Sequence, residues 1–217
     1  MILGVLFDLD GVLVDTLHFH YLAWKHMFEQ NGGTVSKHTV LLHEGRNSRE
    51  ILPILMKESG VHIPEEKQAQ FIEDKRIYYR SIVKVKQYPE ALTVIDTLKK
   101  RGLKVAVVTA CALKNMQFSL SSEQQEHFDF IITGDEVPRA KPYPDPYLTA
   151  AHHLELKPRQ CMVVENAPLG IEAAKNAGMY CVAIVTTLGK EYLTSADLIL
   201  QNIGELPDIP LLKQIRP

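Results

Sequence analysis

Short apolar runs recur along the chain, and most of them are separated by segments with helical periodicity. The runs occupy residues 2–7, 105–108, 130–133, 162–164, 181–185 and 198–200, and their length predicts buried β-strands. Leu92, Ile95 and Leu98 repeat at helical spacing, and basic residues followed by Gly102 mark the end of that helix. Strands that alternate with helices predict a doubly wound α/β fold, in which a parallel sheet is covered on both faces.

Residues 16–82 break this alternation, because they contain helical stripes but no convincing strand. The stripe from Leu17 to Phe28 is apolar at helical spacing, and segments 48–59 and 64–82 place their charges on one face. We therefore predict a helical domain over residues 16–82, inserted into an α/β core domain made of residues 1–15 and 83–217. The proline-containing tail, 206–217, predicts a short final helix followed by a frayed end.

The composition is that of an ordinary globular chain, with 217 residues, 46% hydrophobic and 23% charged. Its net charge of −2 gives no electrostatic reason to expect nucleic acid or an anionic membrane as a partner. No apolar run approaches the roughly 18 residues of a membrane span. The first run is short and ends in aspartates, so we do not expect a secretory signal. Three widely spaced cysteines predict a reducing, cytoplasmic location, and a monomer is favoured.

Two aspartates, Asp8 and Asp10, stand where the first apolar run ends and the chain meets Gly11. Alternate side chains of a strand point the same way, so both carboxylates are expected on one side of the chain until it turns. Burying two carboxylates is costly unless a cation or a proton compensates them. One carboxylate could act as a nucleophile while the other transfers a proton or holds a metal ion. A solvated strand end is the simpler interpretation of Asp-x-Asp alone, and further motifs decide between the two.

The sequence around this pair resembles the first motif of the haloacid dehalogenase superfamily, in its phosphotransferase branch. The motif is Phe-Asp-Leu-Asp-Gly-Val-Leu-Val-Asp-Thr at residues 7–16, and three further segments follow in the order that the superfamily requires. These are Val-Val-Thr-Ala at 107–110, Ala-Lys-Pro-Tyr-Pro-Asp at 140–145, and a segment from 163 to 178 that begins Val-Val-Glu-Asn. The resemblance spans nearly the whole chain and implies a Rossmann-like core. It also places the helical insert, called the cap below, where one type of member carries a helical cap.

The resemblance implies a role for each motif. Asp8 would attack phosphorus and become an aspartyl-phosphate, and Asp10 would protonate the leaving alkoxide and then activate water. Thr109 would donate a hydrogen bond to the phosphate, and Lys141 would bring positive charge to the acids. A lysine before a proline is by itself more often a solvated loop residue, but the Lys-Pro-x-Pro-Asp spacing favours a buried functional lysine at position 141.

A divalent cation is implied as well, and Mg²⁺ fits because it prefers hard oxygen ligands. The implied ligands are Asp8, Asp10, Glu165 and Asn166. Members of the superfamily usually carry a second acid where this chain has Asn166, and an amide oxygen can coordinate Mg²⁺ but brings no negative charge. We therefore expect weaker Mg²⁺ binding, with a larger share taken by Glu165. Replacing Asn166 by Asp is expected to lower the metal concentration that activity requires.

The cap is expected to close over the site and to contact the leaving group of the substrate. The candidate substrate-binding residues are Thr16, His20, Arg46, Ser48, Arg49 and Ala110. The arginines of loop 44–49 could grip an anionic or hydroxylated ligand, or belong to a solvated loop that caps the next helix through Asn47 or Ser48. Glu44 stands where β-phosphoglucomutases carry a lysine, and the loop is one residue longer, which favours a phosphatase.

These observations predict a Mg²⁺-dependent phosphatase that hydrolyses a small phosphorylated metabolite, foremost a sugar phosphate. The alternative is a β-phosphoglucomutase, which moves a phosphoryl group between C1 and C6 of glucose phosphates. A third hypothesis takes Asn166 as the mark of an inactive binding or regulatory protein, and the joint presence of Asp8, Asp10, Thr109 and Lys141 argues against it. A dehalogenase is disfavoured because Asp10 is present and halide displacement needs no metal-binding acids.

Overall fold

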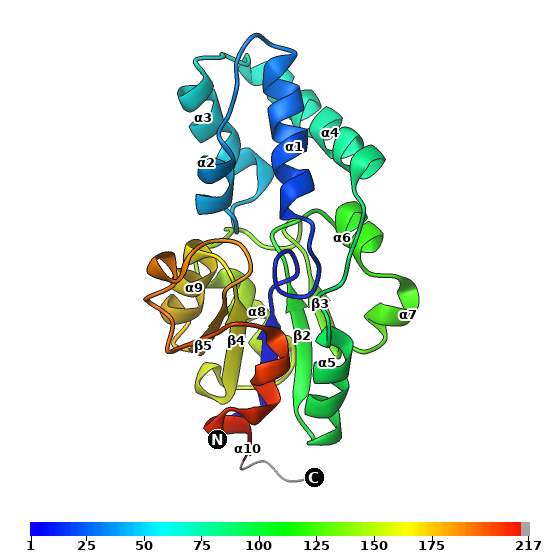
Figure 1. Cartoon of the computed structure of the whole chain (residues 1–217), viewed down its shortest axis with the longest axis vertical. Coiled ribbons are helices and arrows are strands. Elements are labelled where there is room, and N and C mark those ends of the chain that lie inside the picture. Colours follow the sequence, from blue (N-terminus) through cyan, green and yellow to red (C-terminus); the bar gives the residue numbers. More distant parts are fainter. Residues whose placement is uncertain (214–217) are drawn as a thin grey trace.

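The computed structural model describes residues 1–213 and contains a six-stranded parallel sheet (Figure 1). The strands are β1 (Gly4–Phe7), β2 (Lys104–Val108), β3 (Phe130–Ile132), β4 (Cys161–Glu165), β5 (Tyr180–Ile184) and β6 (Leu198–Leu200). Their order is β3-β2-β1-β4-β5-β6, so β1 lies between β2 and β4. Every predicted run forms a strand, and the doubly wound α/β fold is confirmed.

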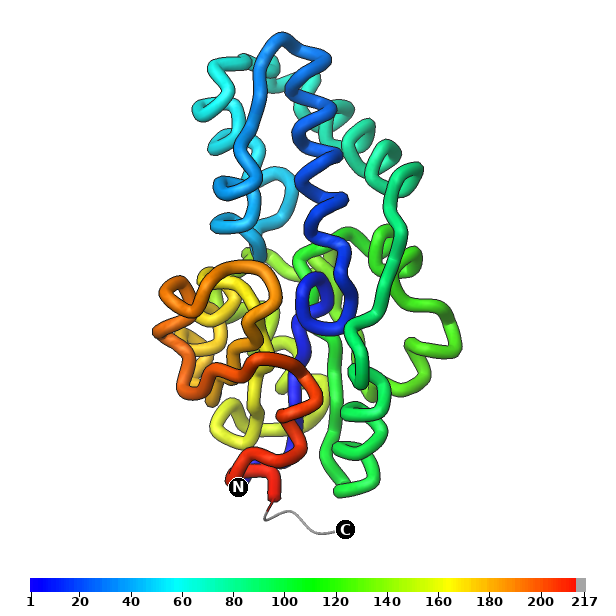
Figure 2. Tube along the Cα trace, in the orientation of Figure 1, coloured from blue at the N-terminus to red at the C-terminus, as the bar shows by residue number. Residues whose placement is uncertain are grey.

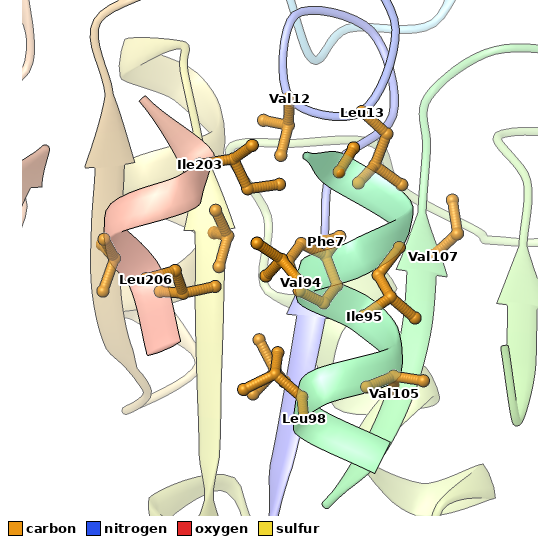
Figure 3. Close-up of a cluster of buried hydrophobic side chains, with 14 of the residues drawn as sticks. Phe7, Val12, Leu13, Val94, Ile95, Leu98, Val105, Val107, Ile203 and Leu206 are labelled. Atoms are coloured by element: carbon orange, nitrogen blue, oxygen red, sulfur yellow. The ribbon is translucent and has the colours of Figure 1, made fainter. Parts of the chain in front are cut away.

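Helices cover both faces of the sheet. They are α5 (Ala91–Lys100), α8 (Asp145–His153), α9 (Pro168–Asn176) and the 3-10 helix η3 (Ile203–Asp208). On one face α5 and η3 pack against Phe7, Val105 and Val107 (Figure 3). On the other face α8 and α9 enclose Leu6 and Val163. Because β1 is covered on both faces, side chains at its C-terminal end lie deep in the molecule.

A second layer of helices lies over the C-terminal edge of the sheet and forms the cap (Figure 1). These helices are α1 (Leu17–Glu29), α2 (Lys37–Leu42), α3 (Ser48–Ser59) and α4 (Glu65–Ile82). They share an apolar cluster that includes Trp24, Phe28, Leu52 and Phe71. The chain enters the cap before α1 and returns to the core after α4, as the tube in Figure 2 shows. The predicted helices are confirmed, whereas the sequence pattern missed α2, which has only 6 residues.

The remaining elements are short. They are α6 (Leu113–Ser119), α7 (Ser122–Gln125), η1 (Pro158–Gln160), η2 (Lys190–Tyr192) and α10 (Pro210–Lys213). Helix α10 agrees with the predicted final helix, and the frayed end predicted for residues 214–217 lies outside the described residues. Across residues 1–213, no helix combines the length and the apolar character that a membrane crossing requires.

Candidate active site

The predicted acids lie in a tight loop that follows β1. Asp8 and Asp10 are each only 4% exposed. Gly11 adopts φ +92°, and its amide donates a hydrogen bond of 2.7 Å to the carbonyl of Val14, which folds the chain back on itself. A Cβ at Gly11 would lie 2.0 Å from Nδ2 of Asn166, so both the backbone conformation and the available space require glycine. The turn therefore brings Gly11, the neighbour of Asp10, into contact with Asn166, which follows β4.

Lys141, from the loop before α8, is completely buried among the acids, so the solvated interpretation of this lysine is wrong. Its Nζ donates hydrogen bonds to Oδ1 of Asp8 (2.5 Å), Oε1 of Glu165 (2.7 Å) and the carbonyl of Val108 (3.1 Å). Burial disfavours the charged lysine, but the carboxylates of Asp8 and Glu165 outweigh this effect and raise the pKa of Lys141. Lys141 is therefore an ammonium group at neutral pH and compensates part of the negative charge.

Glu165 is the last residue of β4, and protein donors engage both of its oxygens. Oε1 accepts hydrogen bonds from Lys141 and, at 2.8 Å, from the hydroxyl of Tyr147. Oε2 accepts from the amides of the next two residues, at 2.8 and 3.1 Å. A Cβ on Gly170 of α9 would lie 1.8 Å from Oε1, so this close approach also needs glycine. The observed contacts make Glu165 a residue that orients Lys141, and its role as a metal ligand stays a prediction.

Asp10 contacts two of the predicted cap-side residues. The hydroxyl of Thr16 donates to Oδ1 of Asp10, and Nε2 of His20 lies 3.6 Å from the same oxygen. Nζ of Lys75 lies 3.0 Å from Nδ1 of His20. Because an ammonium group only donates, Nδ1 accepts and Nε2 carries the proton that faces Asp10. Burial would raise the pKa of Asp10, but its contacts with His20 and Thr16 outweigh this and lower it.

Thr109 and Ala110 follow β2, which neighbours β1 in the sheet. The Thr109 hydroxyl accepts a hydrogen bond of 3.1 Å from the amide of Cys111, so its own proton remains available to a phosphate oxygen. Thr109 is 4% exposed, and Ala110 and Cys111 line the cavity between core and cap. Thr109 thus lies at the same edge of the sheet as Asp8, although the two are distant in the sequence.

The oxygen atoms available to a metal ion lack a full set of partners. Burial raises the pKa of Asp8 to about 8 even though Lys141 counteracts this effect, so a further cation would favour the ionised carboxylate. Oδ1 of Asn166 is buried and has no hydrogen-bond partner among residues 1–213. Within the same range, no three Asp, Glu, His or Cys side chains converge on one metal position. The donors that fit Mg²⁺ are therefore a carboxylate oxygen of Asp8, the amide oxygen of Asn166 and an oxygen of Asp10 that leaves its carboxyl group able to carry a proton.

A cavity of about 50 Å³ lies between the acids and the cap. The predicted substrate-binding residues in its wall are His20, Arg46, Ser48 and Ala110. Arg49 is exposed on the first turn of α3, where Asn47 caps the helix by accepting the amide of Arg49 at 3.0 Å. A water molecule needs about 10–15 Å³ of cavity volume, so the cavity has room for only a few waters. We therefore expect the cap to move away from the core when a sugar phosphate enters.

Two further charged residues of the cap, Glu44 and Lys75, line the cavity beside the predicted substrate-binding residues. Glu44 lines the cavity, and burial together with the charges of Asp10 and Asp8 raises its pKa well above the usual range. Lys75 also lines it and is 3% exposed, yet sequence reasoning missed this residue. Lys75 shares the buried stripe of α4 with Tyr79. A lysine at an apolar position of a helical repeat is the signal that would have identified it.

Comparison of this chain with known proteins identifies the family to which it belongs. The sequence profile of the haloacid dehalogenase-like hydrolases matches residues 5–184. A validoxylamine A 7'-phosphate phosphatase from Streptomyces hygroscopicus subsp. limoneus is 30% identical over 208 residues, covering 93% of this chain and 94% of the relative. A phosphorylated carbohydrates phosphatase from Thermotoga maritima is 30% identical over 221 residues, covering 98% and 99%.

A solved structure shows the same architecture. The β-phosphoglucomutase from Clostridium difficile superimposes with a TM-score of 0.82 at 25% identity, and the match covers 95% of this chain and 93% of that one. The sequence profile and the solved structure both extend over the cap as well as the core. The chain belongs to the haloacid dehalogenase-like hydrolases.

Proposed function

We propose that this chain is a Mg²⁺-dependent phosphatase that hydrolyses a small phosphorylated carbohydrate through an aspartyl-phosphate on Asp8. The observation that carries the proposal is the buried array of Asp8, Lys141 and Glu165 next to Asp10, beneath the cap. The array offers a nucleophile, a second carboxyl group that can carry a proton, and fixed positive charge for a phosphate.

In the first half-reaction a carboxylate oxygen of Asp8 bonds to phosphorus, and the bond between phosphorus and the leaving oxygen breaks. Asp10 gives its proton to that oxygen. The pKa of Asp10 is low in the protein alone, but the negative charge of an arriving phosphate raises it. The hydroxyl of Thr109 donates to a phosphoryl oxygen, and the ammonium group of Lys141 offsets the negative charge around phosphorus.

In the second half-reaction the ionised Asp10 accepts a proton from a water molecule, whose oxygen bonds to phosphorus. The bond between phosphorus and Asp8 breaks, which releases inorganic phosphate and restores the carboxylate. Asp10 then holds the proton for the next cycle. Mg²⁺ would be held by Asp8, Asp10 and Asn166, and when bound it would neutralise charge so that an anionic nucleophile can approach an anionic phosphate.

A phosphatase is favoured over a mutase because Glu44 lines the cavity. A mutase must hold a second phosphate group against the cap while the first one reacts. Burial and the charge of Asp10 raise the pKa of Glu44, and whether ionised or protonated this side chain brings no positive charge to a second phosphate group. The carbohydrate class is supported by the name of the Thermotoga maritima relative. A β-phosphoglucomutase remains the second candidate, because the solved enzyme of that name shares the whole fold.

The test is phosphate release with saturating Mg²⁺ from a panel of sugar phosphates, sugar alcohol phosphates, phosphoglycolate, nucleotides and an aryl phosphate. A separate reaction contains β-glucose 1-phosphate and glucose 1,6-bisphosphate. The proposal expects free phosphate from one or more carbohydrate phosphates and none after chelation of Mg²⁺. Accumulation of glucose 6-phosphate without free phosphate would identify a mutase. No turnover of any compound would contradict both enzyme assignments and support a binding protein.

A further inference from the structure

Two threonines in the loop after β5 connect the loop that follows β1, which contains Asp8, Asp10 and Gly11, to Asn166. The hydroxyl oxygen of Thr186 lies 2.5 Å from the carbonyl oxygen of Gly11, and that of Thr187 lies 2.8 Å from Nδ2 of Asn166. The two hydroxyl oxygens are 3.4 Å apart. Neither threonine belongs to the motifs that identify the family, yet together they form a continuous line of polar atoms from Gly11 to Asn166.

Only one arrangement of the hydroxyl and amide protons puts one proton in each of these three contacts. A carbonyl oxygen only accepts, so Thr186 donates its proton to Gly11. The contact between the hydroxyls then takes the proton of Thr187, whose oxygen is left to accept from the NH₂ group of Asn166. If the amide were rotated by half a turn, Thr187 would donate to Oδ1 and no proton would lie between the two hydroxyl oxygens.

We infer that Thr187, supported by Thr186, is a positioning residue that holds the Asn166 amide so that its Oδ1 is available to a Mg²⁺ ion. Oδ1 is buried without a partner among the described residues, whereas Nδ2 is held by Thr187. Nδ2 is also packed so closely against Gly11 that a Cβ there would lie 2.0 Å from it. The inference rests on the Mg²⁺ dependence that the proposed function includes.

Fixing the orientation matters because this chain has an amide where an acid is usual. A carboxylate presents two equivalent oxygens, so its rotation always leaves an acceptor in the site. A rotated amide would instead present an NH₂ group to the cation and remove a ligand. Groups that orient metal ligands from outside typically change affinity 10- to 100-fold when they are lost. By fixing the orientation of the amide, Thr187 therefore offsets part of the Mg²⁺ affinity that is lost because Asn166 carries no negative charge.

The experiment measures Mg²⁺ affinity of the full-length chain by isothermal titration calorimetry, which needs no turnover. Thr187→Val removes the hydroxyl at nearly constant shape, and Thr187→Ser keeps it. Thr187→Val is expected to raise the dissociation constant about 10-fold, and Thr187→Ser to change it by less than about 3-fold. The same Thr187→Val change in an Asn166→Asp protein is expected to cost less than about 3-fold, because either carboxylate oxygen can bind the ion.

Each other outcome has a definite meaning. Equal losses in the asparagine and aspartate proteins would show that Thr187 acts through packing and would overturn the inference alone. An equal loss for the serine and valine variants would do the same. A wild-type chain that binds no Mg²⁺ would overturn both the inference and the proposed metal dependence. Circular dichroism and thermal unfolding check that each variant is folded, and Thr187→Ala serves in place of Thr187→Val if the latter is not.

Discussion

Lys141 in the core and Lys75 in the cap are both almost completely buried, at 0% and 3% exposure, but their surroundings differ. Lys141 is hydrogen-bonded to two carboxylates, whose charge raises its pKa. Nζ of Lys75 is 3.0 Å from an imidazole nitrogen and 4.9 Å and 5.5 Å from the ring centres of Trp24 and Tyr79. Burial lowers the pKa of Lys75 to about 8, although the charge of Glu44 opposes this. No carboxylate oxygen among the described residues lies within ion-pair distance of Lys75.

The two lysines show that, within residues 1–213, buried positive charge is paired with carboxylates in the core and left without a carboxylate partner in the cap. In the core the ammonium group already has its counter-charges, so the geometry around Asp8 is fixed before a substrate arrives. In the cap, Lys75 lacks such a partner, and Nε of Arg46 is buried without an acceptor in the described part of the chain. We expect these groups to gain a partner when an anionic or hydroxylated ligand enters. Core substitutions should therefore lower activity and stability, whereas cap substitutions should change substrate affinity without lowering stability.

The largest expected effect comes from removing the nucleophile of the core. Asp8→Asn keeps the shape of the side chain but cannot form the aspartyl-phosphate, so phosphate release is expected to fall by at least about 10³-fold. Phosphate release is compared with the wild type, and circular dichroism checks the fold. A folded Asp8→Asn protein that keeps substantial activity would rule out the proposed mechanism.

A second substitution removes the counter-charge of the core. Lys141→Met leaves the carboxylates of Asp8 and Glu165 buried without a cation, and the free energy of unfolding at pH 7 is expected to fall by about 3–5 kcal/mol. Urea unfolding measures the change. The matched control is Lys75→Met, which removes an equally buried lysine that has no carboxylate partner and should not destabilise the protein. Equal destabilisation by both substitutions would contradict the idea that only Lys141 is stabilised by its carboxylate partners.

The third prediction concerns how Lys75 links stability to pH. Its pKa is lowered from the ordinary 10.5 to about 8, so between these values the unfolded chain holds a proton that the folded chain has released. The unfolded state then binds more protons, and the free energy of unfolding rises with pH across this window, by about 3 kcal/mol in total.

Urea unfolding of the wild type and of Lys75→Met from pH 7 to 10.5 isolates this contribution, since the other titrating groups are shared. The variant is expected to be the more stable protein at pH 7, and its advantage should shrink as pH rises. A difference between the two proteins that does not vary with pH would mean that Lys75 is not the titrating group.

The smallest predicted effect compares two arginines of the cap. Arg46 lines the cavity, whereas Arg49 is exposed outside it. Arg46→Ala is expected to raise KM about 10-fold with a smaller change in kcat, which corresponds to one lost charge-assisted hydrogen bond. Arg49→Ala is the matched control and is expected to change KM by less than about 2-fold. The reverse order would contradict the assignment of Arg46, and not Arg49, to the substrate cavity.

The sequence predicts the fold well because its signals are local. Each strand is a short apolar run, and the end of α5 follows from basic residues and Gly102. The array around Asp8 could be anticipated only through the resemblance, since Lys141 and Glu165 are far away along the chain. Lys75 has a local signal, a charge on an apolar stripe. Thr187 has none, because a single hydroxyl in a loop acquires its meaning from the atoms that surround it.

The cap is built as one contiguous segment with an apolar cluster of its own, and this has a consequence for how specificity could diversify. Trp24, Phe28 and Phe71 pack with one another within the cap, and the chain passes between cap and core at its two ends (Figure 2). Exchanging residues 17–82 for the corresponding segment of a relative would leave the hydrogen bonds among Asp8, Lys141 and Glu165 untouched. Under the proposed function, the cap's share of substrate preference could be inherited as a single block, so that one recombination event replaces many separate point mutations.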